Sequence, residues 1–419
     1  MDETMTRVET LGVPFGPFTP TLPKEFSTYD GPLSLRAAAH VLTRTTKGSL
    51  RLDLPDGRRW FFGGGGAPYA VLRVVDPAFA KRPLRSGDVG FAEGSMAGEW
   101  DTPDLSALLA FFSVNFDAAR KVSRGSVAGR IMGWIRHALN ANSKAGAKKN
   151  ILAHYDLGNA FYEKWLDPSM TYSSGIYSAP DEPITDAQNR KYRSIAEQLE
   201  LKPDSNVLEI GSGWGGFAEL AAKEYGAKVT SVTISDAQHA YARKRIFEAG
   251  LAERVDIQMK DYRDIDGKFD GVASIEMFEA VGEKYWPTYF GKIADVIGQR
   301  GRAALQIITI EDSLFESYRS RADFIQRYVF PGGMLPSIPR LETEVERAGL
   351  RLSEAKMFGQ SYAHTLAEWQ TNFDNAWNEI KTLGFDERFR KLWKFYLSYC
   401  EAGFATGRID VGQFALARA

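Results

Sequence analysis

Cysteine is almost absent from this chain of 419 residues, which has only Cys400. A single cysteine excludes a disulfide framework and is typical of a protein in a reducing cytosol. The five histidines are scattered without the spacing of a zinc site, so we expect no metal. Runs of about 18 uninterrupted apolar residues are also missing, which argues against a membrane-spanning helix. We therefore expect a cytoplasmic protein that is soluble or binds the inner face of a membrane peripherally.

Acidic residues are absent between Asp117 and Asp156, although the whole chain has a net charge of only −1. This stretch contains Arg120, Lys121, Arg124, Arg130, Arg136, Lys144, Lys148 and Lys149, and an apolar set at helical spacing, Ile131, Met132, Trp134, Ile135 and Leu139. A basic helix with an apolar face is typical of a membrane-surface segment. The alternative is a solvated linker whose apolar residues dock on a neighbouring domain. Because the stretch has no nucleic-acid recognition motif, we expect no nucleic-acid partner.

This basic stretch, residues 118–150, divides the chain into parts of different character. Residues 1–30 are rich in Pro, Thr and Gly and are interpreted as an irregular arm. Residues 31–117 predict a small α+β domain, in which "SLRLDLPDGRRWFFGG" has the pattern of a β-hairpin around "PDG". Its last segment predicts an apolar helix capped at Thr102 or Asp104.

Residues 151–419 predict a larger α/β domain. Its apolar runs include "NVLEIG", "KVTSVTI", "VDIQMKD", "FDGVASIEM" and "AALQIITI", and helical patterns separate the first three. This alternation is typical of a doubly wound parallel sheet.

A glycine-rich turn, "EIGSGWGG", follows the first of these strands and precedes a helix. Gly211, Gly213 and Gly215 would let the backbone turn sharply while a ligand lies close to it. A dinucleotide pattern could be completed with Gly216, but the next strand ends in "VTIS" without an acidic residue for a ribose. Glu209, just before the turn, instead suits the amino group of a methionine-type ligand. We therefore favour S-adenosylmethionine over a nicotinamide cofactor.

Six stretches in order resemble the cyclopropane-fatty-acyl-phospholipid synthase family. They are "HYDLGNAFYEKWLDPSMTYSSGIY", "VLEIGSGWGG", "VTISDAQHAYA", "KDYRDIDGKFDGVASIEMFEAVG", "FIQRYVFPGGMLPS" and "SYAHTLAEW". The small N-terminal domain is similar to the one that precedes the catalytic core in full-length members. The resemblance implies a Rossmann-like class I methyltransferase core, a smaller lipid-binding domain and a homodimer.

The resemblance also implies the chemistry. Family members act on unsaturated acyl chains of membrane phospholipids. The alkene attacks the methyl group of S-adenosylmethionine, and loss of a proton from that methyl group closes a cyclopropane ring. A bound bicarbonate is implied as the group that takes the proton.

Site residues follow from the resemblance position by position. The cofactor set is Tyr172, Ser173, Gly211, Ser212, Gly213, Thr233, Ile234, Gln238, Tyr262 and Arg263, to which the acidic residue of the turn, Glu209, is added. The implied catalytic set is Glu279, which would hold bicarbonate, its partner Tyr362, and Ser174, Gln306 and the backbone of Ile308.

Two members of the catalytic set depart from the family pattern. Ser174 stands where many members have cysteine, and Gln306 stands where they have histidine. Both can donate hydrogen bonds to an anion. Glu276, in the same stretch as Glu279, is an alternative carboxylate that could face the other way.

The sequence thus predicts a cyclopropane-fatty-acyl-phospholipid synthase. A related lipid methyltransferase that makes methyl-branched or methylene fatty acids is the nearest alternative. A non-catalytic lipid-binding protein and a small-molecule or protein methyltransferase remain as rivals of other classes.

Overall fold

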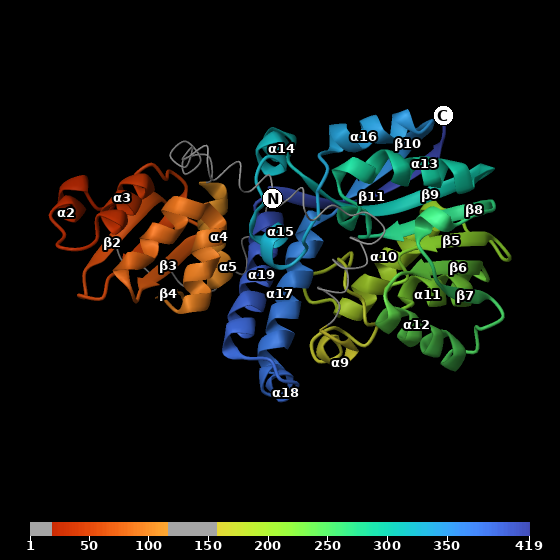
Figure 1. Cartoon of the computed structure of the whole chain (residues 1–419), viewed down its shortest axis with the longest axis horizontal. Coiled ribbons are helices and arrows are strands. Elements are labelled where there is room, and N and C mark those ends of the chain that lie inside the picture. Colours follow the sequence, from red (N-terminus) through yellow and green to blue (C-terminus); the bar gives the residue numbers. More distant parts are fainter. Residues whose placement is uncertain (1–18, 116–156) are drawn as a thin grey trace. The chain divides into compact units, whose positions relative to one another are not determined.

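The computed structural model describes residues 19–115 and 157–419 (Figure 1). The basic linker predicted at residues 118–150 lies outside the described residues, as does most of the predicted N-terminal arm. Internal contacts divide the chain into two units. One joins the N-terminal part of the chain to Gly384–Arg408, and the other contains the described residues from 157 to Leu383 together with Ile409–Ala419.

The first unit is a small α+β domain with a four-stranded sheet in the order β2-β1-β3-β4. Strands β1 and β2 form the predicted antiparallel hairpin around "PDG". Asp104 is the residue that caps α5, because its Oδ1 accepts a hydrogen bond of 2.8 Å from the Ala107 backbone N–H. The elements are α2 Pro23–Ser27, α3 Leu33–Leu42, β1 Gly48–Asp53, β2 Arg59–Gly65, β3 Tyr69–Val74, η2 Pro77–Ala80, α4 Lys81–Ala97, β4 Trp100–Asp101 and α5 Leu105–Val114.

A helix from the far end of the chain completes this unit. Helix α19, Glu387–Ala405, packs against α4 and α5. The Ser106 hydroxyl donates to Glu401 at 2.6 Å, and the Tyr399 hydroxyl donates to Asp88 at 3.1 Å. The structure therefore differs from the predicted boundary, which assigned all of 151–419 to the larger domain.

The second unit is built on a seven-stranded sheet in the order β10-β11-β9-β8-β5-β6-β7. Strands β5, β6, β7, β8 and β9 are parallel, and β11 is antiparallel to both of its neighbours. The strands are β5 Asn206–Ile210, β6 Lys228–Thr233, β7 Val255–Met259, β8 Phe269–Ile275, β9 Ile297–Ile310, β10 Leu350–Met357 and β11 Ile409–Arg418. The doubly wound parallel sheet predicted from the apolar runs is confirmed.

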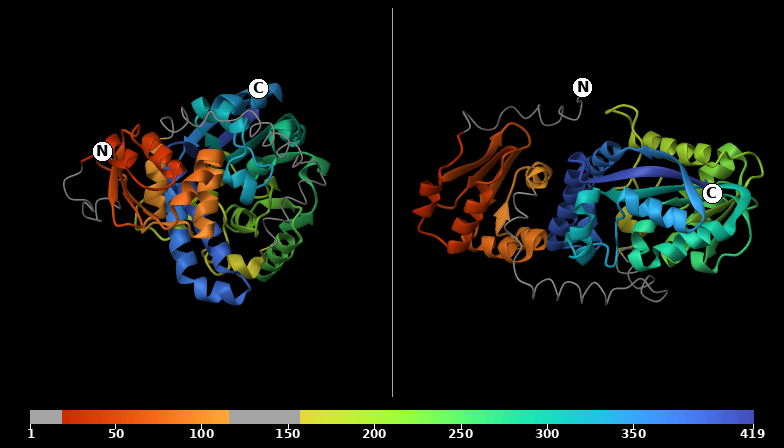
Figure 2. Two further views of the ribbon diagram at one scale, coloured as in Figure 1. Left: turned by 60° about the vertical axis from the view of Figure 1, so that its left-hand side comes forward. Right: turned by 90° about the horizontal axis from the view of Figure 1, so that it is seen from above.

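Helices cover both faces of this sheet. Helices α10, α11 and α12 lie on one side, and α13 and α16 lie on the other (Figures 1 and 2). The helical elements of the unit are α9 Asn159–Tyr162, α10 Ile184–Gln198, α11 Gly216–Tyr225, α12 Asp236–Glu248, η3 Tyr262–Asp264, η4 Phe278–Ala280, η5 Glu283–Tyr285, α13 Trp286–Val296, α14 Asp312–Arg319, α15 Phe324–Tyr328, α16 Ile338–Arg347, α17 Gly359–Asn375 and α18 Trp377–Thr382.

The core between the sheet and α10–α12 fixes the carboxyl ends of the strands. Ile195 of α10 and Phe217 of α11 pack in one buried cluster with Val207 and Val229 of the sheet. In open parallel sheets, ligands bind beyond the carboxyl ends of the strands. The predicted site residues Glu209, Thr233 and Glu279 all lie at or just after such ends.

Candidate active site

The glycine-rich turn joins β5 to α11 with a backbone that requires glycine. Gly211 has a φ of +95° and Gly215 a φ of +87°, values that residues with a side chain rarely adopt. The backbone N–H groups of Gly211 and Ser212 both donate to the Val232 carbonyl at 3.0 Å. A Cβ atom on Gly211 would lie 3.1 Å from Cγ of Met277. The turn is therefore held between β6 and the segment that follows β8.

Glu209 lies at the end of β5 and is buried, with 3% of its surface exposed. The Ser231 hydroxyl donates to its Oε2 at 2.5 Å and lies 2.7 Å from the Ser212 hydroxyl of the turn. Burial raises the pKa of Glu209 to about 8, against the opposing effect of the Ser231 hydrogen bond. Glu209 is therefore joined through one serine to the glycine turn that was predicted to hold the cofactor.

The predicted adenosine-side residues lie after β6 and β7. The Thr233 hydroxyl donates to Oε1 of Gln238 at 3.0 Å, and half-buried Ile234 follows directly. Arg263 donates to both carboxylate oxygens of Asp261, at 2.8 and 2.6 Å. Burial raises the pKa of the Tyr262 hydroxyl to about 12. Thr233, Gln238 and Arg263 are thus fixed by local hydrogen bonds at the same edge of the sheet as the glycine turn.

Tyr172 belongs to a buried aromatic cluster. Its ring centroid lies 5.4 Å from that of Tyr162, 5.7 Å from that of Trp165 and 5.3 Å from that of Trp369. The ring faces of such a cluster carry negative potential, which attracts cations.

Ser173, the next residue, receives a hydrogen bond from a buried lysine. Nζ of Lys191 donates to its hydroxyl at 2.5 Å and lies 4.1 Å from the centroid of the Tyr192 ring. Burial lowers the pKa of Lys191 to about 7, and the nearby Glu276 carboxylate opposes that fall. No sequence motif singled out this lysine on α10 as a functional residue.

Glu276 brings together three residues of the predicted catalytic set. Its Oε1 accepts hydrogen bonds from the Ser174 backbone N–H at 2.9 Å and from Nε2 of Gln306 at 2.7 Å. Its Oε2 accepts one from the Tyr362 hydroxyl at 2.6 Å. The Tyr362 hydroxyl therefore donates its hydrogen bond to Glu276 and not to Glu279, its expected partner.

A further amide fixes the orientation of Gln306. Nε2 of Gln413, on β11, donates to Oε1 of Gln306 at 3.1 Å and to the Lys191 carbonyl at the same distance. With its oxygen held in this way, Gln306 presents its NH₂ group to Glu276. Gln413 is a supporting residue that could not be found from the sequence, because it lies 107 positions from Gln306 in the chain.

Glu279 lies in the short helix η4, three residues after Glu276, and has a different environment. Its Oε1 accepts a hydrogen bond of 2.6 Å from the Ile308 backbone N–H. Its Oε2 is buried and accepts no hydrogen bond from the described residues. Burial, with a smaller contribution from the charge of Glu276, raises the pKa of Glu279 to about 8. The two carboxyl groups therefore differ in their hydrogen bonding, with three donors on Glu276 and one on Glu279.

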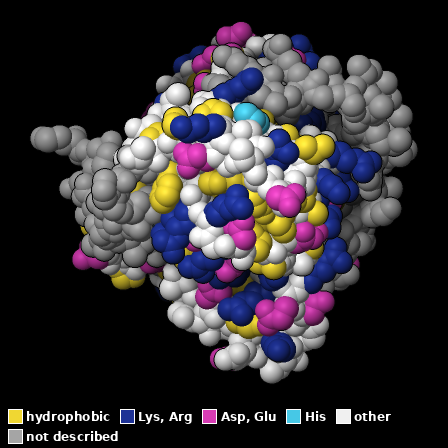
Figure 3. All heavy atoms as spheres, turned by 90° about the vertical axis from the view of Figure 1, so that its left-hand side faces the viewer, with side chains coloured by type: hydrophobic (Ala, Val, Ile, Leu, Met, Phe, Trp, Pro, Cys, Tyr) yellow, Lys and Arg dark blue, Asp and Glu magenta, His cyan; other side chains and the backbone are white. Residues whose placement is uncertain are grey.

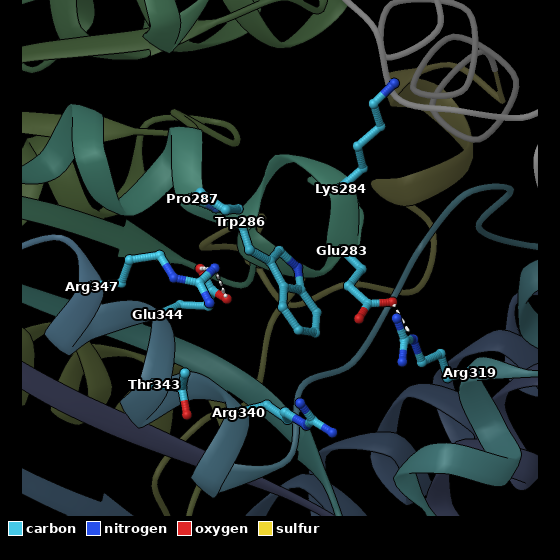
Figure 4. Close-up of a pocket in the computed structure, with 9 residues that line it drawn as sticks. All are labelled: Glu283, Lys284, Trp286, Pro287, Arg319, Arg340, Thr343, Glu344 and Arg347. Carbon is cyan, nitrogen blue, oxygen red and sulfur yellow. Dashed lines mark hydrogen bonds and ion pairs between the residues drawn. The ribbon is translucent and has the colours of Figure 1, made fainter.

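A separate surface hollow of about 450 Å³ contains none of the predicted site residues (Figure 4). It is lined by Glu283, Lys284, Trp286, Pro287, Arg319, Arg340, Thr343, Glu344 and Arg347. Its arginines already form ion pairs: Arg319 with Glu283 at 2.8 Å, Arg347 with Glu344 at 2.9 Å and Arg340 with Glu316 at 2.8 Å. We therefore assign it no role in the reaction.

Residues 19–115 and 157–419 contain neither a candidate metal site nor a candidate membrane-spanning helix. No group of three His, Cys, Asp or Glu side chains in these ranges could hold a metal ion. No helix in them is long and apolar enough to span a membrane.

Comparison with known proteins identifies the family. Residues 142–414 match the mycolic acid cyclopropane synthetase family. The chain belongs to this family. It is an S-adenosylmethionine-dependent methyltransferase, as the glycine turn and the resemblance predicted.

Curated relatives of this family member extend over most of its length. It is 36% identical over 407 residues to the tuberculostearic acid methyltransferase UfaA1 of Mycobacterium tuberculosis, and the match covers 93% of each chain. It is 34% identical over 362 residues to the cyclopropane-fatty-acyl-phospholipid synthase of Escherichia coli, covering 84% of this chain and 89% of the relative.

Solved structures confirm the fold. The mycolic acid cyclopropane synthase CmaA1, in complex with SAH and CTAB, has a TM-score of 0.60 and 26% identity, with 64% of this chain and 97% of that chain covered. The cyclopropane synthase MmaA2 of Mycobacterium tuberculosis has a TM-score of 0.61 and 27% identity, with coverage of 65% and 98%. The Rossmann-like methyltransferase core is thereby confirmed.

Proposed function

We propose that this methyltransferase transfers a methylene group from S-adenosylmethionine to the cis double bond of an unsaturated phospholipid acyl chain. The observation that carries the proposal is a buried carboxylate, Glu276, held by three hydrogen-bond donors beside a cofactor turn and an aromatic cluster. Transfer to oxygen or nitrogen leaves a proton that is readily lost, whereas transfer to an alkene leaves a carbocation and a C–H proton that needs a placed base. The name of the Escherichia coli relative agrees with this reaction.

The cofactor residues have the roles implied by the resemblance. Glu209 receives the amino group of the methionine part, and Gly211, Ser212 and Gly213 lie beneath it. Thr233, Ile234 and Gln238 surround the ribose and adenine, with Tyr262 and Arg263 beside the adenine ring. Tyr172 and Ser173 line the cofactor site.

The reaction requires two kinds of help from the protein. An alkene is a weak nucleophile, so it must be held in line with the S–CH₃ bond, and such alignment can supply several kcal/mol of the barrier reduction. The carbocation that follows is stabilised by electron-rich faces, each contributing about 0.5–2 kcal/mol. The cluster of Tyr172 with Tyr162, Trp165 and Trp369 supports this role.

Bicarbonate, implied by the resemblance, does not fit the residues that were expected to hold it. Ser174 N–H, Gln306 Nε2 and the Tyr362 hydroxyl already donate to Glu276. The Ile308 N–H already donates to Glu279. Because these donors are satisfied by the chain's own carboxyl groups, no step of the proposed reaction passes through bicarbonate.

A second outcome for the same cation is a methylene chain, which a separate reductase would convert to a methyl-branched chain. It is favoured by the 93% coverage of the tuberculostearic acid methyltransferase, the more extensive of the two curated matches. In both outcomes S-adenosylmethionine supplies the carbon, and they differ in whether a hydride shift precedes proton loss.

Proton NMR of the released acyl chains decides between the outcomes. The enzyme is incubated with S-adenosylmethionine and vesicles of a monounsaturated phospholipid, and the fatty acids are then freed. We expect upfield cyclopropane protons. Vinylic or methyl-branch signals would assign the alternative, and failure to modify any unsaturated phospholipid would refute a lipid-directed function.

Membrane binding is part of the proposal. We propose that the small domain captures lipid and that the basic linker attracts anionic headgroups at the inner face of the membrane. Supporting this, Leu22, Leu33 and Val75 of the small domain are 53%, 75% and 60% exposed. Figure 3 shows hydrophobic side chains on one face of the molecule, interspersed with Lys and Arg and also with Asp and Glu. Sedimentation with anionic vesicles tests this. Reversing the charges of Arg130 and Arg136 should weaken binding, and unchanged binding would exclude the linker as a contact.

A homodimer remains a prediction from the resemblance alone. Sedimentation velocity tests it, and a monomer at working concentrations would contradict it.

A further inference from the structure

Glu276 is a carboxylate that the family resemblance did not assign to catalysis. It follows the last residue of β8 and lies at the carboxyl edge of the parallel sheet, where the cofactor turn also lies. Its neighbour Met277 lies against Gly211 of that turn, because Cγ of Met277 is 3.1 Å from the position that a Cβ atom on Gly211 would occupy. The carboxylate is therefore carried by a segment in contact with the cofactor turn.

The backbone of Glu276 is in a conformation that glycine would adopt more easily. Its φ is +49°, in the left-handed region, and its N–H donates to the Gln306 carbonyl at 2.9 Å. Such a conformation at a residue with a side chain persists where the surroundings hold it, and it is often found at functional sites. Here three hydrogen bonds to the carboxylate hold it in place.

All three groups bonded to Glu276 donate, and donated hydrogen bonds stabilise the ionised form relative to the neutral form. Ser174 contributes a backbone N–H, Gln306 an amide N–H and Tyr362 a hydroxyl. Donors around a carboxyl group favour the carboxylate, which can accept a proton. Glu279 accepts a single hydrogen bond. Of the two carboxyl groups, Glu276 is thus the one prepared to act as a base.

We propose that the Glu276 carboxylate itself takes the proton from the transferred methyl group, in place of an exogenous anion. The inference rests on the proposed function. The alkene π electrons form a bond to the methyl carbon while the C–S bond breaks, which releases S-adenosylhomocysteine and leaves a carbocation. A C–H bond of the transferred methyl group then breaks, its electrons close the ring, and the proton moves to Glu276. The protonated carboxyl group returns the proton to solvent before the next turnover.

Burial moves the pKa of Glu276 in the direction that a base requires. Burial raises the pKa of this carboxyl group above its ordinary value, and hydrogen bonds from Tyr362, Ser174 and Gln306, with the charge of Lys191, oppose the rise. A base is most effective when its pKa lies near the working pH. The same burial excludes water, which would otherwise capture the cation.

Two variants of Glu276 and one control test the inference. Glu276→Gln keeps the shape but removes the charge, whereas Glu276→Gly also suits the positive φ and leaves room for a small carboxylate. Glu283→Gln removes a half-buried carboxylate that is paired with Arg319 away from the candidate site, and it serves as the control. Circular dichroism and S-adenosylmethionine binding are measured for each variant, so that misfolding is separated from loss of chemistry.

The decisive readout is turnover in carbonate-free buffer, with and without added bicarbonate or formate. The wild type should be unaffected by either anion, and Glu276→Gln should lose at least about 100-fold in turnover. Glu276→Gly should be equally impaired and should regain about tenfold or more with formate, which can occupy the same three donors. A wild type that depends on bicarbonate, a Glu276→Gln enzyme with nearly full turnover, or a folded Glu276→Gly enzyme that formate does not rescue would each overturn the inference. A wild type that forms no lipid product would overturn the proposed function, and this inference with it.

Discussion

Gly211→Val lowers the affinity for S-adenosylmethionine by about 100-fold. At a φ of +95°, a β-branched residue is severely strained, at a cost of at least about 1–2 kcal/mol. Its Cβ would also press on Met277, 3.1 Å away, and overpacking of this kind costs about 1–3 kcal/mol. Together these effects amount to about 2–5 kcal/mol, a range that includes the 2.8 kcal/mol corresponding to about 100-fold. Isothermal titration calorimetry with S-adenosylmethionine gives the affinity directly.

Gly250→Val is the matched control for backbone strain. Gly250 follows α12 with a φ of +70°, and no atom lies within 4 Å of a Cβ built on it. This variant should lose some thermal stability yet bind the cofactor normally. Equal binding by both variants would show that the turn does not form the cofactor site.

Affinity for S-adenosylmethionine rises with pH up to about pH 8 and then levels off. Burial holds the pKa of Glu209 at about 8 in the free protein, so the group is mostly neutral at pH 6–7. The cationic amino group of the cofactor favours the carboxylate, so binding in this range releases a proton. Linkage then predicts an increase in affinity of up to about tenfold per pH unit. Titrations in buffers of different ionisation enthalpy report the released proton.

Glu209→Gln should remove this pH dependence and weaken binding at pH 8 by about 10–100-fold, because a neutral amide cannot pair with the ammonium group. Its geometry is close to that of the acid, and the Ser231 hydrogen bond can be kept. If wild type and variant show the same slope against pH, Glu209 does not contact the amino group.

Much of the fold could be predicted from the sequence because the relevant signals are local. The apolar runs gave the central strands, and "PDG" gave the hairpin of the small domain. The cap at Asp104 needs only one short polar side chain before an apolar helix. The assignment of α19 to the first unit could not be predicted, because its partners α4 and α5 lie about 300 residues away in the sequence.

The residues of the candidate active site were named from the sequence, but their hydrogen-bond partners were not. Ser174, Gln306 and Tyr362 were all expected there, but motif position favoured Glu279 as their shared carboxylate. Glu276 lies just beyond β8 with a left-handed backbone, so strand alternation does not determine which way its side chain points. Gln413 was missed for another reason, since only the pairing of β11 with β9 brings it to Gln306.

The fate of the methyl hydrogens tests the central claim most directly. The enzyme is supplied with unsaturated phospholipid vesicles and S-adenosylmethionine whose methyl group is fully deuterated, and the released fatty acids are analysed by mass spectrometry and deuterium NMR. If Glu276 takes a proton from the transferred methyl group, the product carries the new carbon with one deuterium fewer than the cofactor supplied. A product that keeps every deuterium of the methyl group would show that the proton leaves from the acyl chain, and this would contradict the account.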